Sequence, residues 1–266
     1  MFRFAAILFV CAGLHAENPW DLLSKAASNR SPVMRVQAVV ATSVIGLQPR
    51  AVLLLEHACT DSAEEVRSAA AQQLGEIKST HSIPVLISLL EDPSPAVAYV
   101  SAQALWRMKN NSGRKLIAAV LAGEGKTDSG AMHGMMHDAQ GKLHDRAGLV
   151  KMGVNQGAGM LLGPFALPLD FAEDLFKDKG APSRVLSAGL LATDTDPSTL
   201  NDLESALRDK SPAVRAAAAK ALSERGSTAS IAKIEPLLSD KNPGARLIAA
   251  AAIVRLQGRT NVRRKR

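Results

Sequence analysis

One motif recurs along this chain and constrains its fold more than any other feature. Its clearest copy runs from Asp209 to Leu222, and the copies align on the position of Arg215. The steps between successive copies are 32, 31, 86, 31 and 31 residues, and the equivalent positions are Arg35, Arg67, Ala98, Arg184, Arg215 and Arg246. We call these six positions the anchors. A fixed period between about 20 and 50 residues is typical of solenoids, in which each unit stacks on the next.

Each copy has the pattern of a helix that begins shortly before its anchor. Four copies carry Ser or Asn four residues before the anchor, followed by proline: Ser31, Ser94, Ser211 and Asn242. These residues are good N-caps, and proline suits the first helical position. The side chains three and four residues after each anchor are small, and the side chain seven residues after it is larger in most copies. These three positions lie on the same face of a helix as the anchor. We therefore predict close-packed second helices, arranged in sequence order, near 32–45, 64–77, 95–108, 182–193, 212–225 and 243–256.

An apolar segment upstream of the motif supplies a first helix to several units. The clearest of these segments are residues 83–90, 199–207 and 231–238. The repeating unit is therefore a helix, a short turn and a second helix. A unit of about 31 residues cannot bury both of its faces alone and must stack on its neighbours. The sequence predicts an all-α protein, an α-solenoid with one irregular insertion.

The motif Asp-x-x-x-x-Val-Arg-x-x-Ala-Ala-x-x-Leu resembles the second helix of HEAT repeats, in the short form also seen in bilin-lyase-like HEAT proteins. The resemblance covers most of 28–109 and 178–257. It implies HEAT-like helical hairpins and a ladder of Asp and Arg between adjacent units. Because Asn29 replaces the Asp and Ala98 the Arg, we expect interruptions there. The ladder residues that the resemblance implies are Asp61, Arg67, Asp178, Arg184, Asp209, Arg215, Asp240 and Arg246.

Residues 1–16 resemble a secretory signal peptide. Arg3 precedes the short apolar stretch 4–14, and Leu14-His-Ala16 forms an acceptable cleavage site. A buried N-terminal helix is the alternative. Export would place the protein in the bacterial periplasm or outside the cell, where nucleic acid is not an expected partner. The remaining segments are N-terminal HEAT-like repeats at 17–122, an insertion at 123–177, C-terminal HEAT-like repeats at 178–257 and a basic tail at 258–266.

The insertion explains the step of 86 residues and has two parts. The first part is rich in Gly, His and Met, and it places His133 and His137 four residues apart, the spacing of a two-ligand metal clip on a helix. Gly134 weakens such a helix, so a polar loop is the alternative. The second part, residues 152–169, carries no charge and contains glycines and prolines that argue against a membrane span. It could fold back on the solenoid or recognise a partner or lipid.

Charge and cysteine content limit the possible functions further. The formal net charge is +7, of which Arg3 supplies one and residues 255–266 supply six, so 17–254 are net neutral. The tail is either a solvated, disordered end or a segment attracted to an anionic membrane surface. Cys59 is the one cysteine after residue 16, which excludes an intramolecular disulfide there, and its apolar neighbours predict a buried side chain.

No catalytic constellation appears in the sequence. We predict a non-enzymatic, protein-binding scaffold of the bacterial envelope that uses its solenoid face and the 123–177 insertion, and that needs no cofactor. Two alternatives remain open. One is an envelope protein held by 152–169 and the basic tail, and the other is a metal-binding accessory protein that uses His133 and His137. The sequence names no partner-binding residue.

Overall fold

The computed structural model describes residues 17–122, 178 and 180–264, and over these residues it confirms an all-α solenoid. Helical hairpins stack side by side, and the described part of the chain contains no strand. The first helices of the units are α1 (Pro19–Ala27), α3 (Pro49–Ala58), α5 (Ile83–Ser88), α7 (Arg114–Leu121), α13 (Ser198–Ala206) and α15 (Ile231–Ile234). The second helices are α2 (Pro32–Ser43), α4 (Glu64–Glu76), α6 (Pro95–Arg107), α12 (Ala181–Leu191), α14 (Pro212–Arg225) and α16 (Pro243–Arg264).

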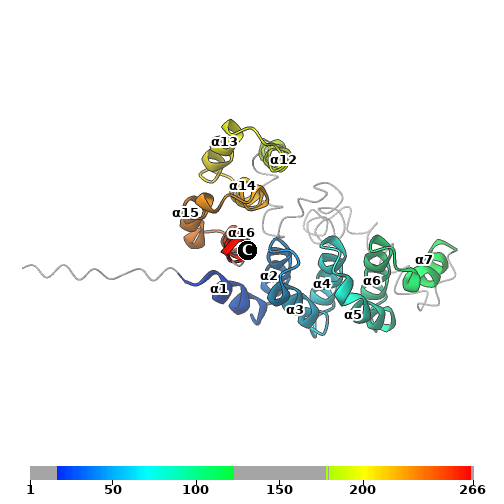
Figure 1. The fold of residues 1–266 in the computed structure, drawn as a ribbon. Helices are drawn as coiled ribbons and strands as arrows, with labels where there is room; N and C mark the ends of the chain where they lie inside the picture. Colours follow the sequence, from blue (N-terminus) through cyan, green and yellow to red (C-terminus); the bar gives the residue numbers. More distant parts are fainter. Residues whose placement is uncertain (1–16, 123–177, 179, 265–266) are drawn as a thin grey trace, which may run out of the picture.

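The second helices form one row, but the row does not follow the sequence. Helix α16 packs against both α1 and α2, so the last unit of the chain stacks on the first. The order in space is α12, α14, α16, α2, α4 and α6, with α7 beyond α6 (Figure 1). The predicted sequence order is therefore wrong. The row bends where α16 meets α2, and α13, α15, α1, α3 and α5 lie on its outer side (Figure 1).

The contact between α16 and α2, which we call the seam, is part of the hydrophobic core. One continuous apolar cluster includes Leu23 and Ala38 near the N-terminus together with Ala249 and Ile253 of α16, all of them buried. Two polar contacts cross the same seam: Arg255 Nη1 donates to the carbonyl of Val44 at 2.7 Å, and Gln48 Nε2 donates to the carbonyl of Val254 at 3.5 Å. Helices α1 and α2 thus share a core with the C-terminal repeats, while a second apolar cluster lies among α2 to α6.

Small side chains let neighbouring second helices approach closely, as the motif predicts. Gly75 of α4 faces Ala104 of α6 so closely that a Cβ on Gly75 would lie 2.7 Å from the Ala104 Cβ and 2.8 Å from its Cα. Gly226 ends α14 in the left-handed conformation, with φ +82°, which glycine adopts without steric cost. A side chain at 226 would also collide with Arg259 of α16.

The N-termini of the second helices differ from the prediction in one detail. The prolines occupy the first helical positions, but the hydroxyls of Ser31, Ser94 and Ser211 make no capping hydrogen bond. The aspartate or asparagine two residues earlier accepts the backbone N–H of the capping residue instead, at 2.8 Å from Asp209 Oδ1 to Ser211 N. Asn242 alone caps as predicted, accepting the N–H of Ala245 at 3.0 Å.

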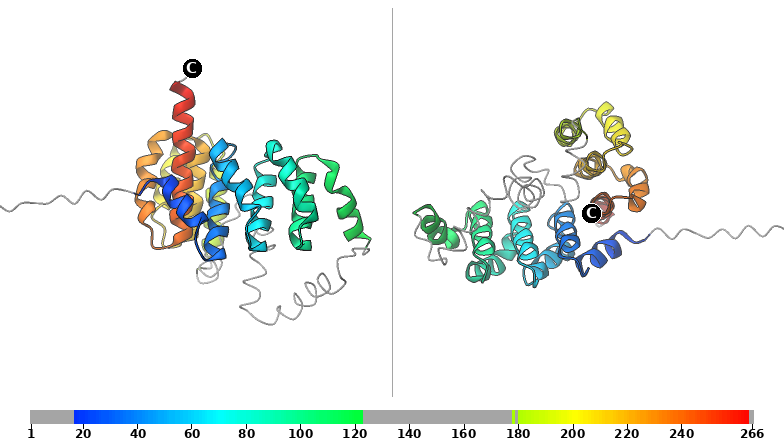
Figure 2. Two further views of the ribbon diagram at one scale, coloured as in Figure 1. Left: turned by 90° about the horizontal axis from the view of Figure 1, so that it is seen from below. Right: turned by 180° about the vertical axis from the view of Figure 1, so that it is seen from behind.

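Most of the C-terminal tail is helical, which differs from the disordered end considered above, and residues 265–266 lie outside the described residues. Residues 258–264 continue α16, which runs from Pro243 to Arg264 as one helix. Seen from the side, α16 projects beyond the other helices and carries the C-terminus at its tip (Figure 2). The expected signal peptide at 1–16 and the 123–177 insertion lie outside the described residues. Among the residues that are described, no helix has the length and apolar character needed to cross a bilayer.

Candidate functional site

Arginine–aspartate pairs join neighbouring units at the N-terminal ends of the second helices. In each rung, an arginine donates two hydrogen bonds through Nε and Nη2 to both carboxylate oxygens of the aspartate in the next unit of the row. The donor–acceptor distances are 2.7–2.9 Å, and the four rungs are Arg35–Asp61, Arg67–Asp92, Arg184–Asp209 and Arg215–Asp240. Paired contacts of this kind fix both distance and orientation.

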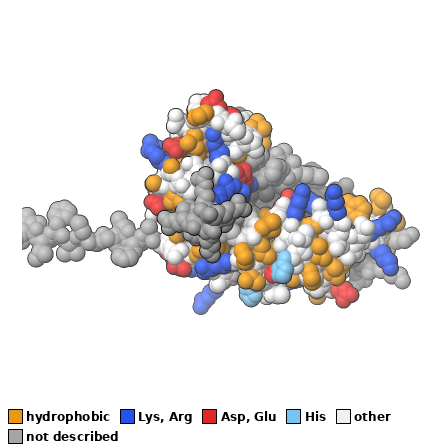
Figure 3. All heavy atoms as spheres, in the orientation of Figure 1, with side chains coloured by type: hydrophobic (Ala, Val, Ile, Leu, Met, Phe, Trp, Pro, Cys, Tyr) orange, Lys and Arg blue, Asp and Glu red, His pale blue; other side chains and the backbone are white. Residues whose placement is uncertain are grey.

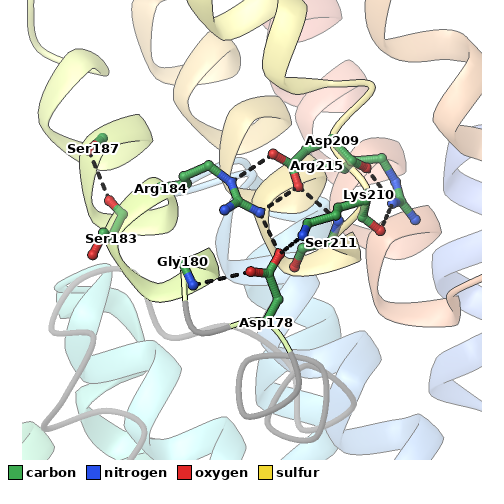
Figure 4. A network of polar contacts seen from close by, with 9 residues as sticks. All are labelled: Asp178, Gly180, Ser183, Arg184, Ser187, Asp209, Lys210, Ser211 and Arg215. Atoms are coloured by element: carbon green, nitrogen blue, oxygen red, sulfur yellow. Dashed lines mark hydrogen bonds and ion pairs between the residues drawn. The ribbon is translucent and has the colours of Figure 1, made fainter.

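Each rung is also tied to its own turn. Arg215 Nη1 donates to the carbonyl of Asp209 at 2.7 Å, while Asp209 itself accepts from Arg184 of the preceding unit (Figure 4). The carboxylate of Asp240 in the same way accepts Arg215 and the N–H of Asn242. One aspartate therefore closes its own turn and links two units, which explains why the motif carries Asp six residues before the anchor.

The ladder stops at three places along the row. At the seam, Arg246 donates only to the carbonyls of Asp240 and Lys241, at 2.6 and 3.2 Å, and Asn29 stands where the next unit would offer a carboxylate. Ala98 has no guanidinium to donate onward. At the opposite end, Asp178 has no preceding unit among the described residues and pairs with its own Arg184 and with Lys210 (Figure 4).

The rungs hold their carboxylates in the ionised form. The hydrogen bonds from Arg35 lower the pKa of Asp61. Burial favours the neutral form of Asp92 and Asp240, but the bonds from arginine and from a backbone N–H outweigh it and lower the pKa of both. Arg184, with help from Lys210 and the Gly180 N–H, lowers the pKa of Asp178 to about 2. The ladder is therefore a set of permanent ion pairs at neutral pH.

A second charged group draws on both halves of the chain, with members on α14 and α16 on one side of the bend and on α4 and α6 on the other. Glu76 of α4 forms a salt bridge with Arg107 of α6, and its charge also acts on Lys220 of α14. The charges of Glu224 in the same helix and of Arg255 in α16 also act on the pKa of Lys220. We call Glu76, Arg107, Lys220, Glu224 and Arg255 the bend cluster. It comprises three cations and two anions from four second helices, linked by one salt bridge and by charge effects on Lys220.

Burial within the bend cluster changes its electrostatics. Burial lowers the pKa of Lys220, Glu224 opposes that shift, Arg255 adds to it, and Glu76 opposes it. Burial likewise lowers the pKa of Arg255, with Glu224 acting in the opposite direction. A half-buried lysine with a perturbed pKa among convergent charges is typical of binding and active sites. The cluster therefore carries charges of both signs from both halves of the chain.

The other candidate residues show no such convergence. Cys59 is buried, and burial, reinforced by Glu56, raises the pKa of its thiol to about 12, so it is a packing residue rather than a nucleophile. His133 and His137 lie outside the described residues. Within the described ranges, no three His, Cys, Asp or Glu side chains are grouped as metal ligands would be.

Comparison with protein families agrees with this geometry. The family described as HEAT repeats matches residues 53–127 and 171–254, which is more than half of the chain. The chain belongs to the HEAT-repeat family. Its second helices are thus the inner helices of HEAT repeats, and the arginine–aspartate rungs join one HEAT repeat to the next. The finer resemblance to the bilin-lyase-like form remains a prediction.

A comparison with solved structures gave human deoxyhypusine hydroxylase in complex with glycerol. The sequence identity is 15%, the TM-score is 0.35, and the match covers 91% of this chain and 97% of that one. At this similarity the match carries no inference about activity. A search of curated proteins gave no match.

Most of the ladder was predictable from the sequence, but the bend cluster was not. Arg35 and Asp92 were not among the predicted ladder residues, although each forms a rung. The bend cluster was missed altogether, yet the sequence contains its signal. Four of its members stand nine residues after an anchor: Glu76, Arg107, Glu224 and Arg255. Only the order of units in space shows that these positions meet.

Proposed function

We propose that this HEAT-repeat chain is a non-enzymatic scaffold of the bacterial envelope that binds a protein partner on the inner face of its bend. The observation that carries the proposal is the bend cluster, in which charges from both halves of the chain converge. A scaffold needs a surface that holds a partner in one orientation, and fixed charges of both signs provide it. The described helices already place these charges without any partner present.

The partner contacts expected at this site follow from its charge. Lys220 and the two arginines give the cluster one more positive than negative group. We therefore expect the partner to present carboxylates toward Lys220 and a smaller basic contribution toward Glu224 or Glu76. Such charges set orientation and association rate more than total affinity, which must come from the apolar surface around them.

Site-specific photo-crosslinking tests the binding face. Gln72 and Gln103 stand five residues after their anchors, as Lys220 does, and so belong to the same line of the row. A photoreactive residue at 72 or 103 should give the same discrete protein adduct in cells that produce this chain. The matched outer positions are Ile87 of α5 and Lys233 of α15, both exposed, and these should not give it. Lys220→Gln should weaken the inner adduct.

Two results would contradict the proposal. One is an adduct of equal yield from the inner and outer positions, and the other is an inner adduct that Lys220→Gln leaves unchanged.

Export is tested separately, by fractionating cells and following the chain with and without residues 1–16. The expected result is recovery outside the cytoplasm only when 1–16 are present.

A further inference from the structure

Arg246 is held in place as the other ladder arginines are, but no carboxylate lies opposite it. Its Nη1 donates to the carbonyls of Asp240 and Lys241 at 2.6 and 3.2 Å. Nη1 of Arg215 makes the equivalent two contacts in its own turn, at 2.7 and 3.1 Å. Because the two guanidinium groups are fixed to their turns in the same way, Arg246 directs Nε and Nη2 across the seam, toward the next unit of the row.

These two atoms of Arg246 have no acceptor among the described residues. In the neighbouring rung, the same atoms of Arg215 donate to both carboxylate oxygens of Asp240. Neither Nε nor Nη2 of Arg246 belongs to the buried polar atoms that lack a partner, so both are open to solvent. Two parallel N–H donors match the two oxygens of a carboxylate. Arg246 therefore presents a binding edge that is already oriented.

Asn29 lies on the other side of the seam, at the rung position of the unit that follows α16 in the row. Its Oδ1 accepts the N–H of Ser31 at 2.9 Å, as Asp209 Oδ1 accepts the N–H of Ser211. The second polar atom of the Asn29 side chain is then Nδ2, a donor. In Asp209 the atom at that place is Oδ2, which accepts the Nε of the ladder arginine. Both sides of the seam thus offer donors, and an acceptor between them is missing.

The two turns at the seam add further positive charge. Arg30 and Lys241 each stand five residues before an anchor, one on either side of the seam, and both are exposed. The carboxylate of Asp240 in the same region is already paired with Arg215. Residues 17–254 are net neutral, and acidic and basic side chains both occur on the face shown in Figure 3. The charge at the seam therefore reflects the missing aspartate and not a general excess of basic residues.

We propose that the seam binds a carboxylate from outside the chain, in the place that an aspartate fills in each rung. The ligand oxygens accept Nε and Nη2 of Arg246 together with Nδ2 of Asn29, and Arg30 and Lys241 attract the ligand from solvent. The ligand is a free carboxylic acid or the acidic side chain of a peptide, because the same guanidinium edge binds a carboxylate in every rung. The site is separate from the bend cluster, since Arg255 lies nine residues, or about 13 Å, farther along α16.

NMR titration of the isotope-labelled full chain tests the proposal. The Nε–H signal of Arg246 is identified by its absence in Arg246→Lys. The probes are acetate and a capped Gly-Asp-Gly peptide, and their controls are chloride at the same ionic strength and a capped Gly-Asn-Gly peptide. Asn29→Asp fills the place with a carboxylate of the chain itself. Asn110→Asp is the matched control, because Asn110 accepts the N–H of Ser112 in an equivalent turn. Circular dichroism checks that all variants stay folded.

The Arg246 signal should shift saturably with acetate, and not with chloride, in the wild type and in Asn110→Asp. Asn29→Asp should bind acetate about tenfold more weakly or less, the effect of losing one charge-assisted hydrogen bond. An additional response to Gly-Asp-Gly would support the proposal with a peptide as the ligand, and a response to acetate alone would support it with a free acid.

Three results would overturn the proposal. They are an equal response to acetate and chloride, an Arg246 signal that acetate does not move, and undiminished acetate binding in Asn29→Asp. Lys220→Gln should bind acetate as the wild type does, so failure of this proposal and failure of the bend cluster as a binding face can be told apart.

Discussion

At the scale of single residues, the rungs between repeats dominate the polar interactions. Each rung combines a two-point ion pair with a hydrogen bond from a backbone N–H of the turn to the carboxylate. Their burial matters, because an exposed ion pair contributes at most about 1 kcal/mol, whereas removing one member of a buried pair leaves an uncompensated charge.

Arg215→Ala should therefore be strongly destabilising. Its partner Asp240 has only 6% of its side chain exposed, so the carboxylate would remain buried without its arginine. We expect the free energy of unfolding to fall by ~3–5 kcal/mol in chemical denaturation. The control is Lys25→Ala, which removes an exposed pair with Glu17 and should cost no more than about 1 kcal/mol. Equal effects of the two changes would show that the rung is only a surface contact.

Stability should depend on acid pH through the ladder carboxylates. Their pKa values are lowered in the folded state, to about 2 for Asp178, so the unfolded chain binds more protons once the pH falls below about 4–5. The stabilisation is complete above that range and is lost as the pH falls through the folded pKa values. Denaturation curves from pH 7 to pH 2 should show this decline, and it should be shallower in Arg215→Met. A flat profile would contradict the pairing.

At the scale of helices, small residues set the spacing of the row. The sequence pattern predicted five of the six second helices to within two residues at each end, because period, proline and alanine all act locally, but it missed the extension of α16 from 256 to Arg264. Gly75→Ala tests the spacing. Alanine favours a helix by about 1 kcal/mol over glycine, but the new Cβ would lie 2.8 Å from the Ala104 Cα.

We expect the steric clash with Ala104 to outweigh the gain in helix propensity, so Gly75→Ala should lower the free energy of unfolding by about 1–3 kcal/mol. Gln72→Ala in the same helix makes no such contact and should change stability much less. The measurement is thermal or chemical unfolding of both variants. If Gly75→Ala raised the free energy of unfolding instead, α4 and α6 would be able to move apart without a loss of stability.

At the scale of the whole molecule, the order of repeats in space is the main finding. The sequence period identifies units but does not say which unit stacks next across the 55 residues of the insertion. Equivalent second helices present equivalent faces, so α16 can pack on α2 as readily as a sequential neighbour would. For the same reason, the bend cluster could not be predicted: its members meet only in this order. The ladder was predictable because each rung joins units whose order in sequence and space agrees.

The missing rung at the seam gives a prediction about this order. Asn29→Asp should restore a carboxylate opposite Arg246 while keeping the hydrogen bond from Ser31 N to the residue 29 side chain, which is 2.9 Å long. We expect the free energy of unfolding to rise by about 1–2 kcal/mol. Asn110→Asp is the matched control, since Asn110 accepts Ser112 N at the same distance with no arginine in rung position. The gain at 29 should disappear in Arg246→Met.

Distances between spin labels test the order of the repeats most directly. Arg30 and Lys241 stand five residues before their anchors and are exposed, as is Lys210. With Cys11 and Cys59 changed to Ala, cysteine pairs 30/241 and 210/241 are labelled and measured by double electron–electron resonance. Because neighbouring helices lie about 10 Å apart, the two pairs should give the same short distance. A 30/241 distance of about 50 Å, five helix spacings, would show that the repeats follow sequence order and that α16 does not pack on α2.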